Sequence, residues 1–191
     1  MRNSGIYIRL VGLMMFVLAL SSCQSGWRDM ELEAVRGSSI SAAEWVENDY
    51  TVLFFLGPEC PLCENYALNF NELYDEFNTE STQFYGIFSG TSYSTDEIIA
   101  YKNEFGVKMP FYLDPEFELA NGVEATVTPE VVVIDGNMNT VYRGAIDNWA
   151  VTVRKHRQVI TEHYLNDVLA ALERGEEPPY RETEPVGCFI E

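Results

Sequence analysis

The sequence predicts an α/β fold in which helices flank a central mixed β-sheet. Strand-like and helix-like segments alternate along the first half of the chain, a pattern typical of parallel neighbouring strands joined by helical crossovers. Two later strands, Glu130–Ile134 and Thr140–Arg143, surround the turn sequence Asp135-Gly136-Asn137. They predict a hairpin that adds an antiparallel edge to the sheet.

The first strand and the first long helix carry the clearest patterns. Thr51–Leu56 is almost wholly apolar, as expected for a strand buried on both faces. In Pro61–Phe77 apolar side chains recur at spacings of four and three, which predicts an amphipathic helix. These apolar residues are Leu62, Tyr66, Phe70, Leu73 and Phe77.

The remaining elements follow from local signals. Ser41 and Glu44 form a capping-box pattern that opens a short helix. Gln83–Phe88 predicts a second strand, and a helix from Ser94 or Thr95 to Phe105 is closed by Gly106. We further expect a short extended piece at Phe111–Leu113, a helical turn at Pro115–Ala120 and a last long helix at Val151–Leu172.

The two ends of the chain are set apart from this domain. Residues 1–22 have a basic start and a short apolar run, which predicts a signal peptide. Leu20-Ser21-Ser22-Cys23 resembles a bacterial lipobox, so we expect a lipid on Cys23 and, because Gln24 follows, the outer membrane rather than the inner one. An ordinary signal peptide or an uncleaved anchor are the alternatives. We expect a tether at 23–38, the domain at 39–175 and a tail at 176–191.

The charge of the chain excludes one class of partner. All 30 acidic residues but only 10 of the 12 basic ones lie in residues 23–191, which therefore carry a formal charge of −20. Such a surface repels nucleic acid and anionic lipid headgroups. We therefore expect no nucleic-acid partner, and a membrane contact only through the lipid on Cys23.

The motif Cys60-Pro61-Leu62-Cys63 follows the first strand directly. A helix that begins at Pro61 directs its free N–H groups and its positive dipole end toward Cys60, which favours the thiolate. We expect Cys60 to be the exposed attacking thiol and Cys63, one turn inside, to be the buried resolving thiol. Two other interpretations remain: half of a zinc site, or two buried thiols without a role.

Two further features could belong to the same site. Thr128-Pro129 stands directly before the apolar strand; base rates favour a trans bond there, whereas a cis bond would present the Thr128 backbone to a bound partner. Cys188, in the tail, could reach Cys60 and form a mixed disulfide, could staple the tail, or could stay unpaired.

His156 and His163 lie seven residues apart in the predicted last helix, with basic neighbours. A solvated helix face accounts for this spacing, and a copper site would require one of the two beside the cysteine pair. We therefore expect no resident metal. Arg143 could supply positive charge near the site, although an exposed hairpin arginine is the simpler interpretation.

These motifs together resemble the thioredoxin fold. More narrowly, the chain resembles the redoxin branch, which is related to the alkyl hydroperoxide reductase/thiol-specific antioxidant proteins and to membrane-tethered thiol-disulfide oxidoreductases. The resemblance covers about residues 40–190 and rests on the segments 54–63, 122–131, 142–147 and 184–188. It implies that Cys60 attacks, that Cys63 resolves, and that Pro129 is a cis-proline beside them, with Pro61, Thr128 and Pro129 contacting the substrate.

The chain departs from its expected relatives at two places. Pro58 and Glu59 stand where a Trp often precedes the first cysteine, and Gly57 stands where peroxiredoxins carry the Thr or Ser that polarises peroxide. We therefore expect a thiol-disulfide oxidoreductase on the periplasmic side of a bacterial envelope. Its only redox group would be the Cys60/Cys63 disulfide, and its partners would be protein thiols or disulfides and a redox partner protein. The alternatives are a thiol-dependent peroxidase, a copper carrier and a non-catalytic binding domain.

Overall fold

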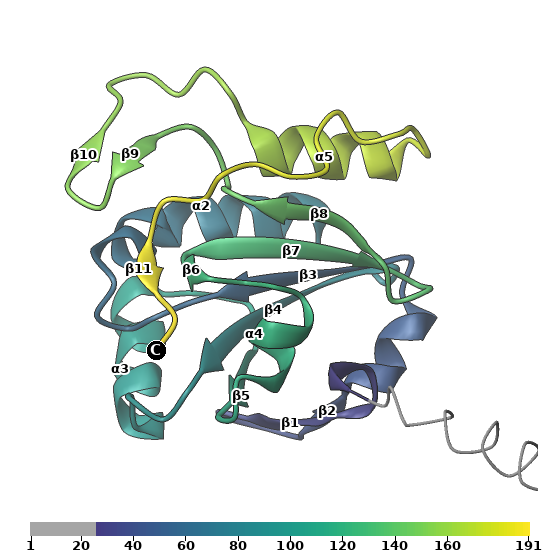
Figure 1. Cartoon of the computed structure of the whole chain (residues 1–191), viewed down its shortest axis with the longest axis vertical. Coiled ribbons are helices and arrows are strands. Elements are labelled where there is room, and N and C mark those ends of the chain that lie inside the picture. The colour runs from purple at the N-terminus through teal and green to yellow at the C-terminus, as the bar shows by residue number, and fades with distance from the viewer. Residues whose placement is uncertain (1–25) are drawn as a thin grey trace, which may run out of the picture.

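The computed structural model of the chain describes residues 26–191 and contains a seven-stranded mixed sheet in the order β2-β1-β5-β4-β3-β7-β8 (Figure 1). The predicted signal peptide, residues 1–22, and the predicted lipid site, Cys23, lie outside the described residues. The sheet strands are β1 (Glu31–Ala34), β2 (Ile40–Ser41), β3 (Tyr50–Phe55), β4 (Thr82–Ser89), β5 (Phe111–Asp114), β7 (Glu130–Asp135) and β8 (Thr140–Gly144).

The predicted mixture of parallel and antiparallel neighbours is confirmed. Strand β3 lies parallel to β4 and antiparallel to β7, and β4 lies parallel to β5. Strands β7 and β8 form the predicted antiparallel hairpin, with Val133 opposite Tyr142. The helices are η3 (Ala42–Glu47), α2 (Pro61–Phe77), α3 (Thr95–Phe105), α4 (Glu118–Gly122) and α5 (Tyr164–Glu173).

Apolar side chains cover both faces of the sheet. Val52 and Phe54 of β3 face the cluster that contains the buried residues of α2, α3 and α5. Leu53 and Phe55 face the other cluster, which contains Trp45 of η3 and the buried residues of α4. This two-sided burial explains why β3 reads as a continuous apolar run rather than as an alternating one.

Helix ends follow the predicted signals where the signal is local. Ser94 caps α3: its side chain accepts from the Glu97 N–H, and Glu97 accepts from the Ser94 N–H at 2.7 Å. Gly106 ends the helix in the left-handed conformation, with φ of 62°, which glycine adopts without steric cost. At the short helix η3, the Ser41 N–H donates to Glu44 as the capping box predicts.

Two segments differ from expectation. The stretch predicted as a tether contributes the 3-10 helix η2 (Trp27–Asp29), with Trp27 buried, and the sheet strand β1. The predicted long helix Val151–Leu172 is wrong over its first half. That half forms a small antiparallel hairpin of β9 (Ala150–Thr152) and β10 (Lys155–His156), and α5 begins only at Tyr164.

The tail crosses back over the molecule after α5. Figure 1 shows it in yellow, running from α5 to the short strand β11 (Cys188–Phe189), which lies beside β6 (Val127–Thr128). These two strands pair antiparallel. Within residues 26–191, no helix has the length and apolarity that crossing a bilayer requires.

Candidate active site

The cysteine pair lies where β3 passes into α2. Leu56 continues the strand pairing by donating to the Ile87 carbonyl at 2.9 Å, and the loop that follows brings Cys60 to the N-cap of α2. Pro61 occupies the first turn, where its missing N–H costs nothing. Cys60 has extended backbone angles, and its carbonyl accepts from the Glu64 N–H to begin the helix. The Cys60 side chain is therefore fixed at the positive end of a 17-residue helix.

Both thiols of the pair are buried, which corrects one expectation. Cys63 is 0 % exposed, as expected for the inner cysteine, but Cys60 is only 2 % exposed. The Cys60 thiol donates to the Thr128 carbonyl at 2.9 Å, and the β11 strand that pairs with Thr128 lies over the same place. Helix position alone suggested an exposed thiol, whereas the cis-proline loop and the tail together cover it.

The two thiols differ strongly in acidity. The pKa of Cys60 is lowered to about 4, and the main cause is the hydrogen bond from the Cys63 side chain. Burial opposes this lowering, whereas hydrogen bonds from the side chains of Cys188 and Thr128 add to it. Burial raises the pKa of Cys63 well above its ordinary value, and the charge on Cys60 raises it further. The Thr128 carbonyl, as an acceptor, favours the protonated Cys60 thiol. The side-chain donors of Cys63, Cys188 and Thr128 favour the thiolate and outweigh that effect. Of the two, Cys60 is thus the thiol that is favoured as its anion, and Cys63 is the one that stays protonated.

The Thr128–Pro129 peptide bond is cis, as the resemblance implied and against the base rate. The carbonyl of Thr128 accepts the hydrogen bond from the Cys60 thiol. The Gly57 backbone lies close by, since a Cβ on Gly57 would sit 3.2 Å from the Thr128 hydroxyl. Cys60, Cys63, Thr128 and Pro129 therefore gather at one place, as predicted.

The residue that holds this loop is Glu130, which the sequence patterns did not predict. Glu130 is buried, and its Oε2 accepts hydrogen bonds from the backbone N–H groups of Thr126 and Val127 at 2.7 and 3.2 Å and from the Thr126 hydroxyl. A buried carboxylate needs such donors to offset its lost hydration. The only signal was a charged residue at the start of an otherwise apolar strand.

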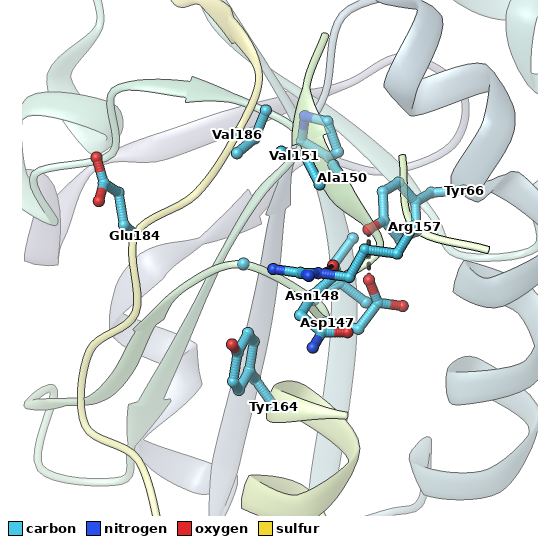
Figure 2. Close-up of a pocket in the computed structure, with 12 residues that line it drawn as sticks. Tyr66, Asp147, Asn148, Ala150, Val151, Arg157, Tyr164, Glu184 and Val186 are labelled. Carbon is cyan, nitrogen blue, oxygen red and sulfur yellow. Dashed lines mark hydrogen bonds between the residues drawn. The ribbon is translucent and has the colours of Figure 1, made fainter. Parts of the chain in front are cut away.

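Pro129 also lines a cavity of about 220 Å³. Figure 2 shows Tyr66 of α2 pointing to Asp147, and the hydroxyl of Tyr66 donates to Asp147 Oδ1 at 2.5 Å. Burial and this contact raise the pKa of Tyr66, so the hydroxyl stays protonated. Glu184 and Val186 from the tail form part of the wall. The tail therefore borders both the cavity and the thiols.

Cys188 joins the cysteine pair. It lies opposite Thr128 in the β6–β11 pairing, and its thiol is in hydrogen-bonding reach of Cys60. Burial, followed by the interaction with Cys60, raises the pKa of Cys188 to about 12. In the structure the three thiols are free. The tail therefore brings Cys188 to the cysteine pair, and Cys188 forms no disulfide in this structure.

Other predicted candidates lie apart from the thiols. Arg143 forms ion pairs with Glu124 and Glu182, both at 2.5 Å. His156 stacks on Trp149 in the β9–β10 hairpin, and His163 precedes α5, so the two do not share a helix face. In the described part of the chain, no group of three or more His, Cys, Asp or Glu side chains is arranged to hold a metal ion.

Comparison with known proteins defines the class. The model of the AhpC/TSA family matches residues 26–143, and the chain belongs to that family. The fold is thioredoxin-like. No curated protein sequence matches the chain.

Solved structures are similar over most of the chain. An uncharacterised conserved protein from Geobacillus kaustophilus is 22 % identical with a TM-score of 0.74, and the match covers 87 % of this chain and 90 % of that one. A hypothetical protein from Sinorhizobium meliloti is 18 % identical with a TM-score of 0.74, covering 86 % and 91 %. A putative thiol:disulfide interchange protein DsbE from Chlorobium tepidum is 13 % identical with a TM-score of 0.53, covering 62 % and 81 %.

Proposed function

We propose that this protein is a thiol-disulfide oxidoreductase that works through Cys60 and Cys63. The observation that carries the proposal is a Cys60 thiol that lies beside a cis-proline and whose pKa is lowered by a hydrogen bond from the Cys63 thiol. A thiolate at neutral pH is the form that attacks disulfides. The family and the fold of the DsbE-like structure are consistent with this chemistry.

The exchange proceeds in two balanced steps. The Cys60 thiolate attacks one sulfur of a partner disulfide, forms a mixed disulfide and releases the other partner sulfur as a thiolate, which takes up a proton. Cys63 then loses its proton and attacks Cys60. This closes the Cys60–Cys63 disulfide and releases the second partner thiol. In the opposite direction, the same steps oxidise a partner dithiol.

The acidity of Cys60 favours one direction. A thiol that is stabilised as its anion makes the reduced protein more stable relative to the disulfide, so the couple becomes a stronger oxidant. We therefore propose that the protein accepts electrons from partner dithiols more readily than thioredoxin does. A redox partner protein would restore its disulfide.

Reduction of insulin by dithiothreitol tests the exchange chemistry. The wild-type protein should accelerate insulin precipitation, Cys60→Ser should abolish the acceleration, and Cys63→Ser, which lacks the resolving thiol, should reduce it. A wild-type rate equal to that of Cys60→Ser would refute the proposal. Lys108→Ala is a matched control, because Lys108 is exposed and pairs only with surface groups.

Peroxide reduction is a second candidate because the family includes antioxidant proteins. The geometry supports it less, since Gly57 supplies no hydroxyl and Arg143 is held by two glutamates. Peroxide bound at Cys60 would lack the cationic donor that polarises its oxygens. Consumption of hydrogen peroxide by the reduced protein, measured beside Cys60→Ser, should be slow; a rate that rivals insulin reduction would reverse this ranking.

We also propose that the mature protein carries a lipid on Cys23 and faces the periplasm. The support is the sequence of the N-terminal segment and the acidic body, which has no charge attraction to anionic headgroups. Expression of the full chain with labelled fatty acid should label the wild type and leave Cys23→Ser unlabelled and released from membranes. Equal labelling of both would refute the anchor.

A further inference from the structure

The tail occupies the edge of the cis-proline loop. Cys188 lies opposite Thr128 and Phe189 opposite Val127 in the antiparallel pairing of β11 with β6, and the Ile190 N–H donates to the Thr126 carbonyl at 3.0 Å. Figure 1 shows β11 as a separate yellow strand that returns to this loop from the far end of α5. An extended peptide bound to the same edge would have to displace it.

Gly187 lets the tail approach this closely. A Cβ at Gly187 would lie 2.4 Å from the Thr128 carbonyl oxygen and 3.0 Å from the Thr128 nitrogen. No side chain larger than a hydrogen fits there without moving the backbone. The register that places Cys188 beside the active site therefore depends on glycine at this position.

Further contacts hold the tail on either side of Gly187. The Thr183 hydroxyl hydrogen-bonds the Tyr142 hydroxyl at 2.7 Å and accepts from the Ala145 N–H at 3.0 Å. At the other end, the Ser92 hydroxyl donates to the Glu191 carbonyl at 3.4 Å. The tail is thus a fixed strand with defined partners, and it brings a third thiol to the other two.

These contacts place a third thiol beside a buried dithiol. Cys60 donates to the same Thr128 that pairs with Cys188. Cys60 and Cys63 are almost fully buried, whereas Cys188 is partly exposed. In this conformation the only partly exposed thiol of the three is the one on the tail.

We propose that Cys188 is a third redox-active thiol and that the tail acts as an internal substrate, which exchanges with the Cys60–Cys63 disulfide to form a Cys60–Cys188 bridge. The proposal rests on the proposed thiol-disulfide exchange. Without the bridge the tail competes with protein substrates for the β6 edge. With the bridge formed, the tail is locked in place and Cys60 is blocked.

The exchange balances without an external oxidant. Cys188 loses its proton and attacks the Cys60 sulfur; the Cys60–Cys63 bond breaks, the Cys60–Cys188 bond forms, and Cys63 leaves as a thiolate that takes up the proton. Burial is the main cause of the raised pKa of Cys188 and remains in the oxidised protein, whereas contact with Cys60 is the second cause. In the oxidised protein Cys60 carries no charge, so that cause disappears when Cys188 must ionise.

A disulfide map tests the proposal directly. Trypsin cleaves after Arg36, Lys102 and Arg181, so Cys60 and Cys63 fall in one peptide and Cys188 in another, residues 182–191. The full chain is equilibrated in glutathione buffers of graded oxidation, quenched with acid, alkylated and digested. We expect a fraction of the wild type to link the two peptides. In Cys63→Ser this linkage should become the main intramolecular disulfide, because no thiol remains to displace Cys188.

Two substitutions in the tail test whether the linkage depends on the position of the β11 strand, since neither removes a cysteine. Gly187→Ala keeps all thiols but displaces the strand, so it should decrease the linked fraction several-fold. Phe189→Ala is the matched control: its side chain is 77 % exposed, and the linked fraction should be unchanged. If Cys188 is alkylated at every buffer ratio in the wild type and Cys63→Ser forms only a glutathione adduct, the proposal is overturned. An equal linked fraction in Gly187→Ala and wild type would also overturn it.

Insulin reduction distinguishes this inference from the function on which it rests. Cys188→Ser should reduce insulin several-fold faster than the wild type, because the covalent lock is gone. If Cys60→Ser is inactive while Cys188→Ser matches the wild-type rate, the inference fails and the function stands. If the wild type is as inactive as Cys60→Ser although the peptides link, the proposed function fails and the bridge stands as a structural disulfide.

Discussion

Removing the Cys63 thiol should make Cys60 a weaker acid. Cys63 is the leading cause of the low pKa of Cys60, ahead of Cys188 and Thr128. A hydrogen bond to a charged group contributes about 1.5–3 kcal/mol, and one pKa unit corresponds to about 1.4 kcal/mol, so Cys63→Ala should raise the pKa of Cys60 by about one to two units. Cys63→Ser keeps a donor at the same place and should raise it less. Cys188→Ala removes a lesser donor and should also have a smaller effect.

The assay is a titration of thiolate absorbance in the ultraviolet. Reduced wild type, Cys63→Ala and Cys63→Ser are scanned over about pH 3 to 8, and the Cys60→Ser curve is subtracted from each. Burial raises the pKa of Cys63, and burial with the Cys60 contact raises that of Cys188, so neither contributes in this range. Identical midpoints for the Ala and Ser variants would refute the reasoning, since the effect would then not come from a hydrogen bond.

The remaining predictions concern stability and potential. The Cys60–Cys63 couple should be more oxidising than about −270 mV, the thioredoxin value, in glutathione equilibrium. In the reduced protein the pKa of Cys60 is depressed, so the contribution of its thiolate to stability is present at high pH and is lost as the pH falls toward about 4. The free energies of unfolding of wild type and Cys60→Ser, measured with urea, should therefore converge at that pH. Glu130→Ala leaves buried donors without an acceptor and should cost about 2–4 kcal/mol, more than Glu130→Gln. Phe54→Ala should cost about 3–5 kcal/mol in the same unfolding assay, because Phe54 is fully buried between Phe70 and Phe84.

Sequence patterns predicted the elements whose signals are local. The apolar run of β3, the three- and four-residue spacing in α2 and the Ser94 and Gly106 ends of α3 all lie within the elements they define. The cysteine motif could be placed at the start of α2 for the same reason. These features needed no knowledge of distant parts of the chain.

The features that could not be predicted depend on packing between distant segments. Strand β1 has only four residues and joins the sheet through β5, about 80 positions further along the chain. The segment before α5 forms a hairpin instead of helix, where β-branched Val151 and Thr152 favour extended backbone. The burial of Cys60 depends on Thr128, 68 positions away, and on the tail beyond it. A pattern read along the chain gives no measure of such contacts.

Thr128 affects both the acidity of Cys60 and the access of substrates to it. The carbonyl of Thr128 accepts from the Cys60 thiol, and the strand that contains Thr128 pairs with the tail that carries Cys188. Glu130 fixes that strand by accepting from the N–H groups of Thr126 and Val127. A shift of the β6 strand therefore changes both the hydrogen bond of Cys60 to Thr128 and the pairing of the tail with β6. For this reason Glu130→Gln, which keeps one acceptor oxygen, should alter the Cys60 pKa and the Cys60–Cys188 linkage in parallel, although Glu130 contacts neither thiol.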